Sequence, residues 1–248
     1  MTIPKQAGIR NRLLAALSPS EFEAIAIKLK SITLDLGEPL HEAGDIIEDV
    51  YFPETGFISA LAVLSDGYHL EIGLIGAEGC AGISVVLGSA TSYSEAMCQT
   101  GGTAWKMSAA NLIQAAADYP HFRNLLLRYV EWFHIQVAQT AACNAHHELG
   151  QRLARWLLSA HDRSGVENLS LTQDLIAIML GVRRSTVSVA AGQLQRAGII
   201  RYQHGLITII DRISLENAAC ECYEAVSGEY RRLFGEHPKD LPTLPVAA

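Results

Sequence analysis

Hydrophobic and polar residues alternate in two different ways along the chain. Residues 10–31 carry apolar side chains at three- and four-residue steps, which predicts helix, with a break and a new helix start at Ser18-Pro19-Ser20. From residue 33 to about residue 107, short apolar runs alternate with Gly and Asp, a pattern typical of a β-sandwich or barrel. Within this part, Asp66-Gly67 predicts a hairpin turn with a positive φ at both central residues.

The pattern becomes helical again after residue 107. A short helix is expected over residues 108–117, and Tyr119-Pro120 ends it before a long helix over about residues 121–144. The long helix is apolar on more than one side and so has to bury more than one side. We expect it to pack on its own barrel and on the same helix of a second copy; burial in a monomer core is the alternative. The residues expected at the dimer interface are Phe122, Leu126, Tyr129, Phe133, Val137 and Thr140.

Residues 171–198 have the spacing of a helix-turn-helix. Thr172 is a suitable N-cap for a first helix, Ala177 is small enough for two helices to cross closely, and Gly181 permits a tight turn. A second helix is expected over about residues 184–197, with Val187 facing inward and a crossing angle near 90–120°. An ordinary helical hairpin is the alternative. The outward Arg, Ser and Thr side chains favour DNA binding, because these residue types reach base edges and phosphates.

A two-stranded ribbon is expected directly after the second helix. Residues 199–203 and 206–210 alternate as strands around His204-Gly205. In that position the ribbon is a wing, from which Arg201 and His204 either touch the DNA backbone or stay in solvent. Further helices are expected over residues 147–159 and 215–234, and a flexible tail over residues 236–248.

These motifs, in this order, resemble the Crp/Fnr family of bacterial transcription regulators. The resemblance covers about residues 13–230 and is specific at the helix-turn-helix. It implies an α+β chain with an N-terminal β-roll or jelly-roll sensor domain, a long dimerisation helix and a C-terminal winged helix-turn-helix. The expected boundaries are 1–118 for the sensor domain, which resembles cyclic-nucleotide-binding domains, 119–145 for the dimerisation helix and 146–235 for the DNA-binding domain.

The resemblance also implies roles for residues of the second helix. Arg184 falls where the family places an arginine that reads a guanine, whereas Ser185 and Val189 depart from a base-reading glutamate and a second arginine. The operator is therefore expected to differ from the usual family sequence. The implied partners are double-stranded DNA, a second copy of the chain and RNA polymerase. The residues expected to contact DNA are Arg183, Arg184, Ser185, Thr186, Ser188, Val189, Arg196, Arg201 and His204.

The charge distribution agrees with DNA binding, although the formal net charge of the chain is −7. Residues 1–145 hold eight Lys and Arg against fifteen Asp and Glu, whereas residues 146–248 hold eleven of each. Residues 170–212 contain five Arg and only two Asp, with no Lys or Glu. Because affinity for DNA depends on local neutralisation of phosphates, the acidic first half does not argue against DNA as a partner.

The expected sensor domain lacks the signatures of known effectors. In the cyclic-nucleotide-binding members a Glu contacts the ribose and an Arg the phosphate, but here Ile83 stands in place of the Glu and no Arg follows in the segment up to Gln99. Residues 31–105 contain eleven acidic residues and no Lys or Arg, so a buried phosphate would have no cation. We therefore name no cofactor and leave the signal open.

The cysteines do not form a recognisable metal motif. Their number is odd and their spacing scattered, and Cys220-x-Cys222 is a weak metal pair without further ligands. Cys80 and Cys98 are too few for an iron–sulfur cluster. Five histidines could bind haem or a metal, but lone histidines are more often structural, so no metal ligand is assigned. These histidines are His41, His69, His134, His146 and His147.

Other functions fit the pattern less well. The main alternative is a regulatory sensor subunit whose C-terminal helical domain binds protein rather than DNA, which the outward arginines and the wing disfavour. The nucleophile-elbow, P-loop, HExxH and GxGxxG motifs are all absent from the sequence, so no enzyme activity is expected. No apolar run reaches the roughly 18 residues of a membrane helix, and the chain is expected in the cytoplasm.

Overall fold

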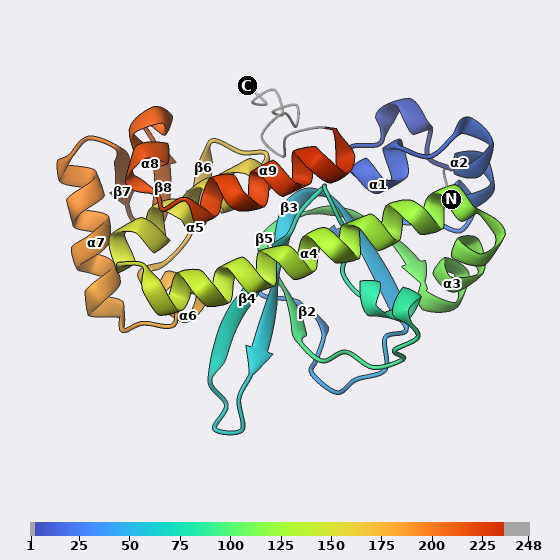
Figure 1. Cartoon of the computed structure of the whole chain (residues 1–248), viewed down its shortest axis with the longest axis horizontal. Helices are drawn as coiled ribbons and strands as arrows, with labels where there is room; N and C mark the ends of the chain where they lie inside the picture. Colours follow the sequence, from blue (N-terminus) through green and yellow to red (C-terminus); the bar gives the residue numbers. More distant parts are fainter. Residues whose placement is uncertain (1–2, 236–248) are drawn as a thin grey trace. The chain divides into compact units, whose positions relative to one another are not determined.

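The computed structural model describes residues 3–235, so the expected tail over residues 236–248 lies outside the described residues (Figure 1). Two compact units are present. The first comprises residues 3–62 and 74–134, and the second comprises residues 63–73 and 135–235. The long helix α4, Pro120–His146, runs from the first unit into the second.

The first unit is built on an antiparallel sheet. The strands of this sheet are β1 Lys30–Leu34, β2 Pro39–His41, β3 Asp49–Val63, β4 His69–Ile75 and β5 Glu95–Ser108, and most of β4 belongs to the second unit. The order is β1-β5-β3-β4, and β2 also pairs with β5. The pairing of β3 with β5 contains register shifts near Thr55 and Phe57, which are typical of strongly bent sheets. The expectation of a β-rich domain with many turns is confirmed, and its helical segments are η1 Gln6–Gly8, α1 Arg12–Ala15, α2 Pro19–Ala26, η2 Ile83–Leu87 and α3 Ala109–Asp118.

The helical start of the chain is fixed to the sheet by one buried side chain. The Nδ2 of Asn11 donates to the carbonyl oxygens of Pro53 and Gly79, at 3.1 and 2.8 Å, and its side chain also caps α1. Gly79 cannot carry a side chain, because a Cβ there would lie 2.1 Å from the ring of Tyr129. The expected helix over residues 10–31 breaks at Ser18, as predicted, but it ends at Ala26, and Lys30 already belongs to a strand.

The hairpin turn at Asp66-Gly67 differs from its prediction. Gly67 has a φ of 81°, whereas His204 is the one described non-glycine residue with a positive φ, so Asp66 does not share it. Instead the carboxylate of Asp66 accepts from the amide of Tyr68 at 3.0 Å, and the amide of Leu64 bonds to the carbonyl of Tyr68. The side chain of Asp66 therefore closes a longer turn, and only one residue needs a left-handed backbone.

The long helix confirms its predicted length, and four of the six residues predicted at the dimer interface are buried within one protomer. Phe122, Leu126 and Tyr129 are completely buried within their own chain, and Thr140 is 7% exposed. Phe133 and Val137 are half-buried. The four buried side chains pack on their own chain, and the interface stays a prediction.

The opposite side of α4 is the solvent-facing one. Most side chains on this side are exposed or half-exposed, including Arg123, Arg128 and Glu131. At 100° per residue, six of them, separated by steps of three and four residues, lie along one line that we call the outer stripe. The helical spacing of apolar residues predicted a helix with two apolar sides, but it did not indicate which side packs against the rest of the chain. The residues of this outer stripe are Leu127, Val130, His134, Ala138, Ala141 and Ala145.

The second unit is organised around α5, Leu149–Ser164. It contacts α7 Arg184–Arg196, α8 Arg212–Ala218, α9 Cys222–Phe234 and β6 Asn168–Ser170. Strands β7 Ile200–Gln203 and β8 Leu206–Ile209 join β6 in a small sheet of order β6-β8-β7. The sequence did not predict β6, and the expected single helix over residues 215–234 is in fact two helices, because the chain leaves the helical path at residues 219–221.

A buried ion pair joins α5 to the two C-terminal helices. The carboxylate of Asp162, 8% exposed, lies 2.7 Å from Nη2 of Arg212 and accepts from the hydroxyl of Tyr223 at 2.7 Å. Arg212 also donates to the Tyr223 hydroxyl at 2.8 Å. Burial, followed by the Asp162 charge, raises the pKa of Tyr223. The three side chains form a closed polar network in which each buried charge has a partner.

We predict that Asp162→Ala lowers the free energy of unfolding by about 3 kcal/mol, because it removes the buried carboxylate that pairs with Arg212 and Tyr223 and leaves Arg212 only the more exposed Glu216. The exposed pair of Arg232 and Glu229 provides the control, and Glu229→Ala is expected to cost about 1 kcal/mol or less. Urea denaturation of the full chain measures both. Equal costs for the two variants would contradict the importance of this network.

Candidate nucleic-acid interface

The first helix of the helix-turn-helix is α6, Gln173–Leu180. As predicted, Thr172 is its N-cap: the hydroxyl oxygen accepts from the amide of Leu175 at 3.2 Å. Asp174 lies in the first turn, where a carboxylate is favoured by the helix dipole. The buried face is apolar and consists of Ile176, Ala177, Met179 and Leu180.

A tight turn reverses the chain between α6 and α7. Gly181 has a φ of 65°, a left-handed conformation that glycine adopts without steric cost. The amide of Val182 bonds to the carbonyl of Ala177 at 3.0 Å and fixes the end of α6. The two helices are bent by 105° at this turn, within the range expected for a helix-turn-helix.

The second helix, α7, separates cleanly into a buried and an exposed side. Its inward residues are Val187, Ala190, Ala191 and Leu194, all buried. Every residue that the sequence predicted to contact DNA is exposed, which the prediction requires but which does not test it. Those residues are Arg183, Arg184, Ser185, Thr186, Ser188, Val189, Arg196, Arg201 and His204.

Gln173 and Asp174 of α6 complete this exposed face, although they were not among the residues predicted to contact DNA. The hydroxyl of Ser188 donates to Oε1 of Gln173, so Gln173 is held beside α7. Nε of Arg184 lies 3.6 Å from the carboxylate of Asp174, and the two side chains are 64% and 66% exposed. Such an exposed pair contributes little stability, so Arg184 can exchange Asp174 for another acceptor at small cost. The polar residues in the first turn of α6 could have indicated in the sequence that Gln173 and Asp174 belong to this exposed face.

The wing is attached to the same unit by Tyr202. Its hydroxyl donates to the carbonyl of Leu171 at 2.8 Å, and its amide donates to Oε1 of Gln195 on α7 at 2.7 Å. The wing turn consists of His204 and Gly205, with φ values of 51° and 79°. Positive φ at both turn residues is the geometry of a two-residue hairpin, and it projects His204 into solvent.

The sensor-side cysteines are enclosed and unreactive. Cys80 and Cys98 are completely buried, and burial raises the pKa of both thiols, to about 11 for Cys98. The Cys98 thiol donates to the carbonyl of Thr100. Because thiolate is the reactive form, these two residues are poor candidates for redox chemistry.

The cations on the first part of α4 face solvent. Arg123 and Arg128 are exposed, whereas Leu125, Leu126 and Tyr129 form the buried side of the helix. Ile83, which replaces the expected ribose-binding glutamate, begins the short helix η2 and is half-buried. Among the described residues, these two arginines therefore do not supply a buried counter-charge for a phosphate.

No single helix within residues 3–235 is long and apolar enough to cross a membrane. One bent pair passes by length and composition, and it is α6 with α7, the helix-turn-helix itself. Arg184 and Arg196 lie on the exposed side of this pair.

Comparison with known proteins agrees with this geometry. Residues 151–218 match the model of the Crp-like helix-turn-helix domain. The global nitrogen regulator of Synechocystis sp. (strain PCC 6803) is 24% identical over 192 residues, which cover 74% of this chain and 85% of the relative. The match to the Crp-like helix-turn-helix domain disfavours the alternative of a C-terminal domain that binds only protein.

Solved structures share the fold over most of their length. FixK2 from Bradyrhizobium japonicum superposes with a TM-score of 0.68 at 19% identity, covering 77% of this chain and 98% of that chain. A CRP/FNR-family transcriptional regulator from Thermus thermophilus gives 0.62 at 21% identity, covering 79% and 98%. The chain therefore has the fold of the Crp/Fnr regulators, with a Crp-like helix-turn-helix at its C-terminal end, and it is a DNA-binding transcription regulator.

Proposed function

We propose that the protein acts in the cytoplasm as a homodimer on a two-fold symmetric operator, with α7 of each protomer in the major groove. The observation that carries this proposal is the exposed side of α7, where Arg184, Ser185, Ser188 and Val189 follow one another along the N-terminal half of the helix. Recognition helices contact base edges with their N-terminal residues. The polar side chains suit base edges, and exposed Val189 suits a thymine methyl group.

The remaining basic residues fit a second role. Arg196 lies in the last turn of α7 and Arg201 on the first wing strand, both exposed. Contacts to phosphates position a protein on the duplex but carry no sequence information. We assign Arg196, Arg201 and His204 to the DNA backbone and Arg184 to a base. We also propose that the protein contacts RNA polymerase. We assign no catalytic role to any residue.

We predict that Arg184→Ala weakens binding to the preferred site by about 1–3 kcal/mol and relaxes the preference at one base position, because a bidentate contact to guanine is lost. Arg201→Ala is the matched control. It should weaken binding equally for all sequences and reduce the salt dependence by about one phosphate contact. Footprinting and titration of single-base variants measure both; equal loss for all sequences with Arg184→Ala would contradict base reading.

The dimer is proposed to form through the outer stripe of α4. Its steps of three and four residues match the seam of a coiled coil, and Ala138, Ala141 and Ala145 allow two helices to approach closely. Half-buried Leu127 and Val130 add apolar surface at its N-terminal end. This stripe differs from the interface that the sequence predicted, which included the half-buried Phe133 and Val137.

We predict that Ala138→Glu converts the protein from a dimer into a folded monomer, because two carboxylates would meet where the helices cross. Ala117→Glu, on the exposed side of α3, introduces the same side chain outside the stripe and should leave the dimer intact. Sedimentation at micromolar concentration distinguishes the species. A wild-type monomer, or a dimer that survives Ala138→Glu, would contradict the proposal.

We further predict that neither cyclic AMP nor cyclic GMP binds the sensor unit. Residues 31–105 hold eleven acids and no Lys or Arg, so a phosphate diester would be repelled rather than held. Calorimetric titration with each nucleotide at millimolar concentration should give no saturable heat. A saturable signal with a micromolar constant would show a phosphate site built from backbone amides alone.

A further inference from the structure

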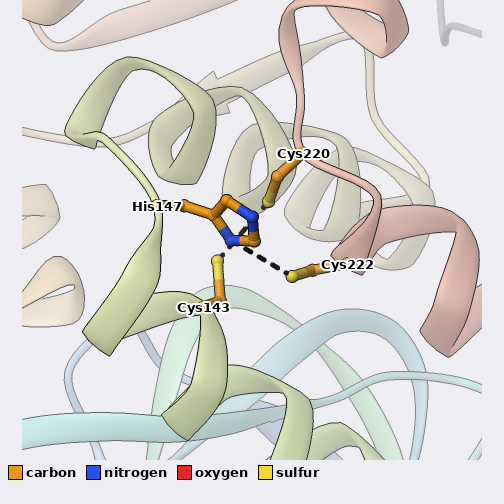
Figure 2. Close-up of side chains that lie close together, drawn as sticks. All are labelled: Cys143, His147, Cys220 and Cys222. Atoms are coloured by element: carbon orange, nitrogen blue, oxygen red, sulfur yellow. Dashed lines mark hydrogen bonds between the residues drawn. The ribbon is translucent and has the colours of Figure 1, made fainter.

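Four potential metal ligands that lie far apart in the sequence meet in the second unit. Figure 2 shows the side chains of Cys143, His147, Cys220 and Cys222 directed toward one another. Cys143 is in the last turn of α4, His147 follows its end, and the other two cysteines come from the junction of α8 with α9. The sequence predicted no metal ligands, because the C-terminal pair stood alone until the fold brought Cys143 and His147 beside it.

Local backbone geometry places each pair on one side. The amide of His147 bonds to the carbonyl of Cys143 at 3.0 Å, so these residues keep the four-residue step of a helix and face the same way. The amide of Tyr223 bonds to the carbonyl of Cys220 at 3.2 Å, which turns the chain sharply between the two helices. Cys220 and Cys222 therefore converge on the same point.

The separation of the ligand atoms suits a single ion. The four atoms lie within 4.8 Å of one another, with Sγ of Cys143 3.5 Å from Sγ of Cys220 and Sγ of Cys222 3.5 Å from Nδ1 of His147. Zinc–sulfur bonds of about 2.3 Å in a tetrahedron separate two sulfurs by about 3.8 Å. A multi-iron cluster holds its thiolates around a much larger core.

The surroundings also match those of a closed metal site. Nε2 of His147 lies 3.2 Å from the carboxylate of Glu221, which leaves Nδ1 facing the sulfurs as an acceptor. Metal-binding histidines usually have such a carboxylate partner on the other ring nitrogen. Nε2 of Gln139 donates to Sγ of Cys222 at 3.1 Å. All three cysteines are buried, so four protein ligands can exclude water.

Two arginines of α5 supply compensating charge. Three thiolates, a neutral imidazole and a divalent ion carry one net negative charge. Arg155 is 7% exposed, interacts electrostatically with Cys143, and its Nε has no hydrogen-bond partner among the described residues. Arg152 interacts electrostatically with Cys143 and Cys220. A buried cation beside three neutral thiols has no counter-charge there, whereas beside a metal-bound thiolate it has one.

We propose that Cys143, His147, Cys220 and Cys222 bind one zinc ion in a closed, structural site. Soft thiolates with one imidazole are a ligand set that zinc favours, and four protein ligands without an open position are typical of structural zinc. The ion joins the end of α4 to the junction of α8 with α9, and so stabilises the unit that carries the helix-turn-helix. The site is separate from the DNA-reading face and does not depend on the proposed operator.

The first test is the metal content of the full chain purified under reducing conditions. We expect one zinc per chain by mass spectrometry of the metal, loss of zinc in Cys222→Ser, and full retention in Cys98→Ser. Cys98 is an equally buried cysteine outside the cluster, and serine can keep its bond to Thr100. Zinc retained in both variants would overturn the proposal.

A second pair of variants keeps all four ligands, so it does not depend on how well a ligand variant folds. The side chain of Glu221 is 76% exposed, so Glu221→Gln removes only the carboxylate partner of His147. This change should weaken zinc affinity roughly 10–100-fold. Glu224→Gln, on the exposed side of α9, should leave the affinity unchanged. Competition with a chromophoric chelator measures both, and equal affinities would overturn the role assigned to Glu221 as the carboxylate partner of a zinc-bound His147.

Cobalt substitution reads the ligand set directly. Tetrahedral cobalt bound by thiolates should give intense visible bands and a sulfur-to-cobalt charge-transfer band, both lost in Cys222→Ser and kept in Cys98→Ser. Octahedral cobalt spectra, failure of the reduced chain to take up zinc or cobalt, or a disulfide between Cys143 and Cys220 in freshly isolated protein would each overturn the proposal. Iron–sulfur absorption in the purified chain would do so as well.

Discussion

The burial of α5 is the constraint on which the second unit depends. A helix that contacts α7, α8, α9 and β6 has almost no side left for water, yet it carries Arg155, Asp162 and Arg163 in its buried set. A buried charge is tolerated only with a partner. Asp162 has Arg212 of α8, and Arg163 donates to Oε1 of Gln136 on α4 as well as to the carbonyl of Ser159 within α5. The elements that supply these partners are therefore fixed in place, and the recognition helix is packed on the same support.

This arrangement explains how an acidic protein can present a face for DNA. Packing against α5 turns Val187 and Leu194 of α7 inward, so the polar residues between them have to face solvent. The exposed pair of Arg184 and Asp174 contributes little stability, so Arg184 can leave Asp174 for an acceptor on DNA. Affinity then comes from the local surplus of arginine, and the acidic charge of the first unit lies elsewhere in the sequence.

The sequence predicted those features that depend on local spacing. The small Ala177, the turn at Gly181 and the inward Val187 define the helix-turn-helix, because the crossing angle and the turn allow few alternatives at these positions. The wing followed from alternation around His204-Gly205. The sequence did not predict β6, whose three residues are too short for a pattern, or the break between α8 and α9.

Long-range pairing could not be predicted for a physical reason. Periodicity showed that α4 has two apolar sides, but the side that meets its own chain depends on residues far away, such as Gly79 opposite Tyr129. The thiol and imidazole cluster is a similar case, because 72 residues of the second unit lie between His147 and Cys220. Only the folded chain brings these two segments together.

The central claim is that two copies of the exposed α7 face read one duplex. Selection of bound sequences from a pool of random duplexes tests this most directly. The account predicts enrichment of an inverted repeat whose half-site centres lie about one helical turn apart, roughly 34–36 Å. Enrichment of a single asymmetric motif, or no enrichment above the starting pool, would contradict it.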